Sequence, residues 1–199
     1  MANRTAYNSI GNRLGRLLQQ YNLRVAYAEY RSEMYAEEQG KASALGNGYK
    51  ALQATISKQC WETYAKNLSD KRDELTDAIK TSLVGYNDRQ KKVWYAYFIE
   101  NKTAEAIATE INTVERTVMR MVSVMRDDME MNFSASLPKM GDRPSYPWSP
   151  TDLANFLTES PAPDYVSAVS DCMSYGIVDA DALENDRMFQ EFLNNGGKH

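Results

Sequence analysis

Apolar residues near the start of the chain recur every three or four positions, as they do on one face of a helix. The positions that form this stripe are Tyr7, Ile10, Leu14, Leu17, Tyr21 and Val25. The pattern predicts one long helix over residues 5–40. Because the spacing is close to a heptad repeat, the stripe must be buried against later helices or against a second copy of the chain. A homodimer is therefore one expected assembly.

Several arginines lie along the same helix, and we expect them on its solvated side, from which they could also touch a phosphate backbone. They are Arg13, Arg16, Arg24 and Arg31. Gly40, Gly46 and Gly48 then predict a break. Two further helices should follow, over residues 49–67 and from Ser69-Asp70 to Gly85. The three helices are expected to form a bundle.

The stretch from Tyr86 to Glu130 carries three more apolar stripes at helical spacing. Asn87 or Asp88 can cap the start of the first of these helices. Its inward positions are Val93, Trp94, Tyr97 and Phe98. The helix should end near Asn101, because asparagine tolerates the conformation that a turn requires.

The second and third stripes leave room for only one sharp turn between them. Thr103 is expected to cap the second helix. The inward positions of that helix are Ala104, Ile107, Ala108 and Ile111. Asn112 can take the left-handed conformation of a tight turn, and Thr113 can cap the third helix. The inward positions of the third helix are Val118, Met121, Val122 and Met125. Two short helices joined in this way are typical of a helix-turn-helix that contacts DNA.

The outward side of the third helix is polar and basic, and in such units this side enters the major groove. We predict base contacts from Arg116, Thr117, Met119, Arg120 and Ser123. An arginine can pair with both acceptors of a guanine, which gives about 1–3 kcal/mol of discrimination. We predict phosphate contacts from Lys91, Lys92, Lys102, Thr113 and Arg126. The expected partner is double-stranded DNA.

Behind this unit the composition changes. Residues 133–150 contain four prolines, which predicts a linker or an extended loop. Ser149 and Pro150 predict the start of a short helix, with a serine cap and proline in the first position. Two more helices are expected near residues 163–175 and 180–193.

The sequence therefore predicts an all-α protein with a long N-terminal helix. We expect these parts: a helical bundle and region of possible oligomerisation (1–85), a central helix-turn-helix (86–132), a linker (133–150) and a small acidic helical module (151–199). Residues 1–132 contain 19 basic and 17 acidic side chains, whereas residues 133–199 contain 4 and 10. The acidic module will not lie along phosphate. It could contact RNA polymerase, mask the basic face or keep the protein in solution, and it either folds alone or docks on the bundle.

The composition argues against catalysis, a bound cofactor and a metal site. The one histidine is the last residue, His199, which removes most general-base, triad and zinc arrangements. Cys60 and Cys172 lie in different regions and suit a reducing cytosol. No run of about 18 apolar residues exists, so no membrane span is expected. We expect a cytoplasmic protein of a bacterium, or of the host cell if a phage encodes it.

One run in the central segment combines several local motifs: VWYAYFIENKTAEAIATEINTVERTVMRMVSVMRDDM. An apolar helix ends in an aromatic pair, a short turn leads to Thr103, and an Ile-Ala pair lies in the second helix. The third helix contains Thr117 and Val118. This pattern resembles region four of bacterial sigma factors, over about 45 of the 199 residues. The family usually has Gly at the position of Asn112 and a Ser cap at that of Val114. The resemblance implies a protein that recognises a promoter element.

A helical front half with a sigma-like unit near the middle is also similar to phage late-gene transcription regulators of the RinA and ArpU type. That resemblance implies a regulator encoded by a phage or prophage. Two alternatives stay open. A phage small terminase subunit also combines a helix-turn-helix with an oligomerising helical part. A protein-interaction module would instead bind RNA polymerase or a sigma factor without touching DNA.

Overall fold

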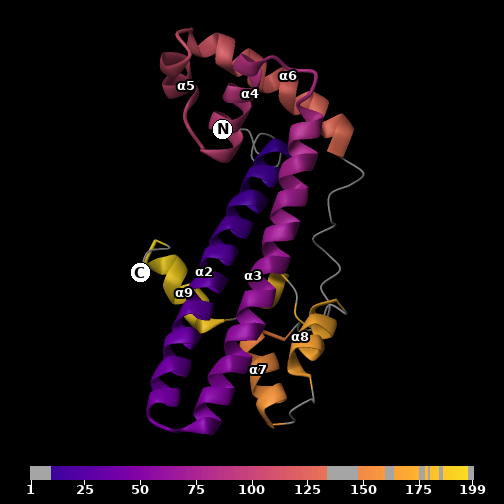
Figure 1. The fold of residues 1–199 in the computed structure, drawn as a ribbon. Helices are drawn as coiled ribbons and strands as arrows, with labels where there is room; N and C mark the ends of the chain where they lie inside the picture. The colour runs from indigo at the N-terminus through magenta and orange to yellow at the C-terminus, as the bar shows by residue number, and fades with distance from the viewer. Residues whose placement is uncertain are drawn as a thin grey trace. The chain divides into compact units, whose positions relative to one another are not determined.

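The computed structural model of the chain describes residues 10–133, 148–159, 164–174, 178, 180–183 and 186–196. Every regular element among these residues is a helix, which confirms the predicted all-α fold (Figure 1). In chain order the elements are α2 (Ile10–Ala44), α3 (Gly48–Ser82), α4 (Asp88–Trp94), the π-helix η1 (Tyr95–Ile99), α5 (Ala104–Glu110), α6 (Glu115–Phe133), α7 (Pro150–Glu159), α8 (Tyr165–Ser174), the 3-10 helix η2 (Ala180–Leu183) and α9 (Arg187–Asn194). Across the described residues, no helix combines the length and the apolar character that a membrane span requires. Most of the predicted linker, residues 134–147, lies outside the described residues.

The chain divides into two compact units, each built from two separate stretches of sequence. The first unit comprises Met1–Gln20 and Arg72–Met140, and it contains α4, η1, α5 and α6. The second comprises Tyr21–Lys71 and Gly141–His199, and it contains α7, α8, η2 and α9. The long helices α2 and α3 contribute residues to both units. The boundaries of the four predicted parts of the chain stay a prediction.

In the second unit, α2 and α3 lie side by side and antiparallel, joined by a tight turn at residues 45–47 (Figure 1). Gly46 is left-handed, with φ +68, and the amides of Gly46 and Asn47 donate to carbonyls one turn back at 3.0 and 2.9 Å. These bonds satisfy the last carbonyls of α2 and end the helix, as Gly46 predicted. The break expected at Gly40 is wrong. The helix continues through it to Ala44, because one glycine costs a helix only about 1 kcal/mol.

A second correction concerns α3, which runs without interruption from Gly48 to Ser82 where two helices were predicted. The break expected at Ser69 and Asp70 is wrong. Neither residue forbids helical geometry as proline would, and buried apolar positions continue at helical spacing on both sides of them. Those positions include Tyr64, Leu68 and Ile79, each 1 % exposed.

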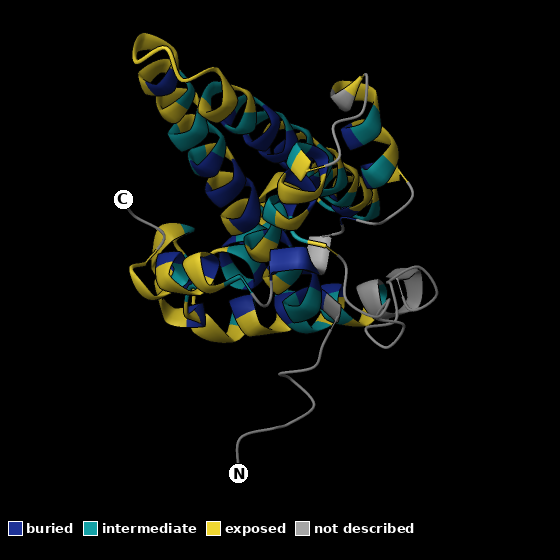
Figure 2. Cartoon of the chain, turned by 90° about the horizontal axis from the view of Figure 1, so that it is seen from below, coloured by how far each residue is buried: buried dark blue, intermediate teal, exposed yellow. Residues whose placement is uncertain are grey.

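The C-terminal helices dock on the α2–α3 hairpin of the second unit. Of the two predicted alternatives, folding alone or docking on the bundle, the structure shows docking. Their apolar side chains share one core with Tyr27 and Trp61 of the hairpin. The docked side chains include Leu153, Leu157, Val169, Met173, Phe189 and Phe192. Figure 2 shows such buried residues, in dark blue, along the faces where helices meet.

Local capping fixes where the C-terminal helices begin. The Ser149 hydroxyl accepts the Asp152 amide at 3.1 Å, and the Asp152 carboxylate accepts the Ser149 amide at 3.0 Å, which confirms the predicted helix start. The single helix expected over residues 180–193 is wrong. The Asp186 carboxylate accepts the Phe189 amide at 3.0 Å and therefore starts a new helix, α9, after η2.

Two arginines of α2 are buried, contrary to the expectation of a solvated side. Arg24 is 8 % exposed and Arg31 is 5 % exposed. The Arg31 guanidinium donates to the hydroxyls of Tyr27 and Tyr35 at 2.9 and 3.0 Å. Its Cζ atom also lies 4.8 Å from the centre of the Trp61 ring. Aromatic faces and hydroxyl oxygens thus accommodate the charge inside the second unit.

Both cysteines belong to this core. Cys60 is fully buried, as predicted, and burial raises the pKa of its thiol to about 12. Cys172 is half-buried and packs against the same cluster of apolar residues. The fold therefore brings into one core two free thiols that the sequence places in different regions.

In the first unit, α2 approaches η1 so closely that only glycine fits. A Cβ atom on Gly15 would lie 1.8 Å from the Phe98 carbonyl oxygen, and one on Gly11 would lie 2.6 Å from the Phe98 ring. One turn further along α2, the Gln19 side chain donates to the Ile99 carbonyl. The backbones of α2 and η1 therefore pack directly against each other.

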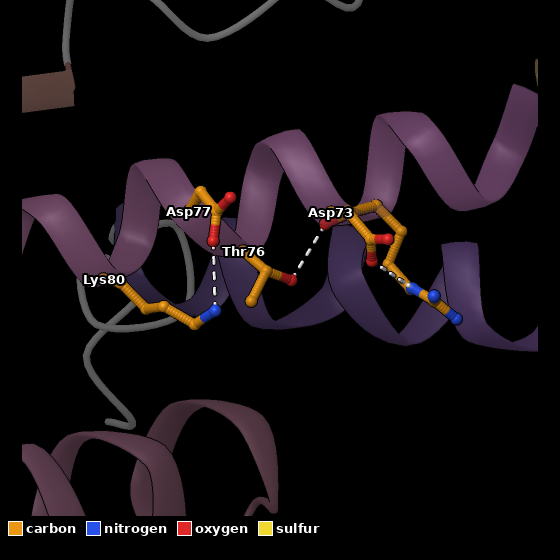
Figure 3. Close-up of polar contacts among 5 residues, drawn as sticks. Asp73, Thr76, Asp77 and Lys80 are labelled. Carbon is orange, nitrogen blue, oxygen red and sulfur yellow. Dashed lines mark hydrogen bonds and ion pairs between the residues drawn. The ribbon is translucent and has the colours of Figure 1, made fainter.

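The outer side of α3 in the first unit is polar, and its side chains are paired locally (Figure 3). Lys80 donates to Asp77 at 3.0 Å, and Arg72 donates to Asp73 at 3.1 Å. The Thr76 hydroxyl donates to the Arg72 carbonyl at 2.8 Å. Water screens such exposed pairs, so they contribute little to stability, and we assign this face no role beyond solvation.

Replacement of Gly15 tests the contact between α2 and η1. Gly15→Ala should lower the free energy of unfolding by about 1–3 kcal/mol, because the added methyl group meets a backbone oxygen that cannot rotate away. Denaturant unfolding followed by circular dichroism measures the change.

Gly40→Ala is the matched control, since Gly40 lies in the same helix and a methyl group added there would meet nothing within 4 Å beyond its chain neighbours and the nearby backbone of its own helix. That substitution should raise stability by up to about 1 kcal/mol through helix propensity alone. Equal stabilisation by both changes would contradict the packing of α2 on η1.

Candidate nucleic-acid interface

The helices that lead into the candidate interface begin and end as the sequence predicts. The Asn87 side chain accepts the Gln90 amide at 2.9 Å, and the Gln90 side chain accepts the Asn87 amide at 3.0 Å, which starts α4. Asn101 is left-handed, with φ +53, just after η1 ends. The Thr103 hydroxyl then accepts the Ala106 amide at 3.2 Å and caps α5.

The turn between α5 and α6 depends on Asn112, whose φ is +51. Asparagine adopts this left-handed conformation more readily than most residues with a side chain, so the prediction for Asn112 is confirmed. The Thr113 amide donates to the Ala108 carbonyl at 2.9 Å and closes the end of α5. From α4, the Arg89 guanidinium donates to the Ile111 carbonyl at 3.1 Å. The turn is therefore fixed to both helices that precede it.

The first residue of α6 is Glu115, which makes Val114 the capping position. The cap expected at Thr113 is wrong by one residue, because the Val114 carbonyl accepts the first backbone hydrogen bonds of α6. The Val114 carbonyl accepts the Val118 amide at 3.3 Å, but a valine side chain cannot accept a hydrogen bond from the first turn. The start of α6 thus lacks one stabilising contact that a serine would supply.

A buried stripe sets the rotation of α6 about its own axis. This stripe packs in one core with Trp94, Ile107 and Ala108, and its members are at most 4 % exposed. They are Val118, Val122 and Met125. Further along α6, the Tyr86 hydroxyl donates to the Asp128 carboxylate. Burial, together with Asp128, raises the pKa of Tyr86 to about 12, so the hydroxyl remains a donor at neutral pH.

The opposite side of α6 is open. Arg116, Met119 and Arg120 are exposed, while Thr117 and Ser123 are half-buried. Among the described residues, neither Arg116 nor Arg120 takes part in an ion pair. The five predicted base-contacting side chains therefore lie on one helix, and the two arginines among them are accessible. Their contact with DNA stays a prediction.

Two more residues share this open side, and neither was among the predicted DNA contacts. Val124 is 49 % exposed, and Asp127 is exposed as well. The sequence spacing could have predicted the position of Val124. It follows Arg120 by four residues, as Arg120 follows Arg116, and residues four apart lie on the same side of a helix. Valines among other apolar residues usually belong to the core, which is why Val124 did not stand out.

The residues predicted to contact phosphate lie in three places. Lys91, Lys92 and Lys102 line an open groove of about 820 Å³ between α4, η1 and α5, to which α6 contributes no side chain. Thr113 lies half-buried in the turn. Arg126 is on α6, where it donates to Ser123 and to Asp127, both at 3.3 Å.

One lysine of the groove, Lys102, already forms ion pairs with two carboxylates. The Lys102 ammonium lies 2.9 Å from a Glu100 oxygen and 2.7 Å from a Glu110 oxygen. These two carboxylates raise the pKa of Lys102, and a phosphate would have to compete with them for the ammonium. Lys91 and Lys92 are the better candidates for contact with a backbone, since Lys92 is exposed and Lys91 half-buried.

Comparison of the chain with family models, with curated proteins and with solved structures found no match. The likeness to region four of sigma factors and to phage late regulators therefore stays a prediction from the residues alone.

Substitution of Asn112 tests the left-handed turn. Asn112→Ala should lower the free energy of unfolding by about 1–2 kcal/mol, because a methyl side chain strains this conformation, whereas Asn112→Gly should not lower it. Asn22→Ala, at an exposed position within α2, is the control and should not destabilise the protein. A harmless Asn112→Ala in denaturant unfolding would show that the turn differs from this geometry.

Substitution of Val114 tests the start of α6. Val114→Ser should raise the free energy of unfolding by about 1 kcal/mol, because the hydroxyl can accept an amide of the first turn. Val84→Ser is the control, since Val84 is exposed to a similar degree (75 % against 65 %) but lies in a turn outside any helix start. No gain over this control in thermal unfolding would place the first turn of α6 elsewhere.

Proposed function

We propose that this chain is a sequence-specific DNA-binding protein that regulates transcription, with α5, the Asn112 turn and α6 as its helix-turn-helix. In this proposal α6 enters the major groove, and Arg116 and Arg120 contact base edges. Met119, Thr117 and Ser123 assist them. Lys91 and Lys92 hold the phosphate backbone. The proposal includes no catalytic step and no cofactor. The likeness to region four of sigma factors points to a promoter as the target, and the likeness to phage late regulators points to a phage or prophage origin.

The observation that supports this proposal is the open side of α6. An exposed arginine lays its apolar stem on the protein surface and keeps its charged head group in water, where a ligand can reach it. Arg116 and Arg120 are exposed one helical turn apart, and neither takes part in an ion pair with a described residue. Two such guanidiniums on a helix that follows a tight turn form the donor array that guanine accepts in the major groove.

The charge of the segment limits how DNA would be bound. Residues 86–128 contain seven basic and seven acidic side chains, so the segment has no net charge with which to attract phosphate. Non-specific binding, which depends on that attraction, should therefore be weak. Affinity would have to come from base contacts and from the local pair Lys91 and Lys92, and it should depend strongly on sequence.

The groove between α4, η1 and α5 favours a second candidate function, a protein-interaction module. Tyr95, Ala96, Ile107 and Ile111 give this groove an apolar floor, and both acidic and basic side chains border it. An apolar floor with a mixed polar rim is typical of a surface that binds protein. In that case the chain would bind RNA polymerase or a sigma factor without DNA, and co-purification with polymerase in the absence of DNA affinity would identify it.

Selection of duplexes from a random library with the full chain, followed by mobility-shift measurements, tests the first proposal. Arg116→Ala or Arg120→Ala should reduce binding to the selected duplex about fivefold to 150-fold and flatten the sequence preference. Lys91→Ala or Lys92→Ala should weaken all duplexes alike and reduce the slope of affinity against salt by about one.

Arg187→Ala is the control, because it removes the same charge from an arginine that is 91 % exposed on α9. Its effect should be small. Failure to select any duplex, or binding that none of the four variants alters, would exclude this surface as a DNA contact. Ring-shaped assemblies of the purified chain that select a single duplex would favour the small-terminase alternative.

A further inference from the structure

The open side of α6 carries an ordered row of side chains. Residues four apart on a helix lie on one ridge, and one ridge of α6 runs through Arg116, Arg120 and Val124 to Asp128. Arg116, Arg120 and Val124 are exposed, whereas Asp128 is half-buried and accepts the Tyr86 hydroxyl. The ridge therefore presents two guanidiniums and then a branched apolar side chain, in that order, from the start of α6.

The neighbouring ridge of α6 has a different chemistry. It runs through Glu115, Met119, Ser123 and Asp127. A carboxylate stands at each end of this row, and the Asp127 carboxylate accepts the Arg126 guanidinium at 3.3 Å. Carboxylates close to phosphate are repelled, so this ridge cannot lie along a DNA strand for its full length. The ridge that starts at Arg116 has a carboxylate only at its far end, where Tyr86 binds Asp128, and it is therefore the better fit to the floor of a groove.

The spacing of the favoured ridge matches that of base pairs. Four residues of helix advance about 6 Å, and a base pair advances about 3.4 Å along DNA. Each step from Arg116 to Arg120 to Val124 therefore covers about two base pairs. In the major groove an arginine pairs with guanine, and an apolar side chain pairs with the 5-methyl group of thymine.

We infer that Val124 determines specificity by contacting a thymine methyl group, about two base pairs beyond the guanine that Arg120 contacts. The preferred duplex then contains two guanines about two base pairs apart, and a thymine at the same interval on the Val124 side. This inference rests on the proposed DNA-binding function and names the sequence class that the same surface selects.

The exposure of Val124 supports this inference, because an accessible side chain can contact a thymine methyl group. About half of the side chain is accessible to solvent, in contrast to Val118 and Val122 of the same helix, which are at most 4 % exposed. Val124 is therefore not needed to fill the core of the first unit. Burial of its methyl groups against a thymine methyl would remove apolar surface from water on both sides of the contact.

Replacement of thymine by uracil tests this contact, because it deletes only the 5-methyl group. In the selected duplex, uracil at that thymine should weaken binding of the wild-type chain about fourfold, the worth of one buried methyl group. Val124→Ala should bind the thymine duplex more weakly and should no longer distinguish thymine from uracil. Since Val124 is half-exposed and alanine favours a helix, this variant keeps the fold.

Val84→Ala is the matched control, because it truncates an exposed valine of the same unit that lies outside α6. It should retain the full fourfold difference between thymine and uracil. If duplexes are selected but the wild-type chain ignores the uracil substitution, or Val124→Ala keeps the same sensitivity, the role of Val124 is overturned while DNA binding stands. If no duplex is selected at all, the proposed function itself fails, and this inference fails with it.

Discussion

The helix α6 can bury only one of its sides, and the account of this protein depends on which side that is. Val118, Val122 and Met125 occupy the core of the first unit, and this packing fixes the rotation of the helix. The left-handed residue Asn112 sets the direction in which α6 leaves α5. With rotation and direction fixed, Arg116 and Arg120 have to face away from the protein. No change confined to the outer side would redirect them, because the core determines their position.

The same unit shows how α5, the Asn112 turn and α6 are held by contacts that lie outside them. Arg89 binds the carbonyl of Ile111, and Tyr86 binds the carboxylate of Asp128, so residues before α5 secure both the turn and the far part of α6. Gly15 allows α2 to meet the backbone at Phe98 directly. The open side of α6 is therefore held by contacts from outside α5 and α6, and under the proposed function such preorganisation would lower the entropic cost of binding.

Local chemistry made much of this surface predictable. Thr103, Asn87 and Asn112 act on amides or on a backbone conformation within a few residues, so their roles can be inferred from the chain alone. The apolar stripe of α6 was predictable for the same reason. The cap predicted at Thr113 shows the limit of this approach, because the Val114 carbonyl, one position further on, accepts the first hydrogen bonds of α6.

Contacts between distant segments could not be predicted. No residue near Gly15 in the sequence indicates that Gly15 packs against the Phe98 carbonyl. The burial of Arg31 likewise depends on Trp61, which belongs to another helix. Ser69 and Asp70 looked like a helix start, but continued burial of the stripe along α3 outweighed their preference for a cap. Val124 was missed because its exposure depends on how α6 packs. The all-α class, which depends on periodicity alone, was predicted correctly.

The most direct test of the central claim is to ask which surface touches DNA. A photo-cross-linking amino acid in place of Met119 on α6, or in place of the exposed Glu62 on α3 as a reference, would be irradiated with a selected duplex. The account predicts cross-links to bases from position 119 and none from position 62. Cross-links from neither position, under conditions where the duplex is bound, would show that DNA meets another face and that the open side of α6 serves a different purpose.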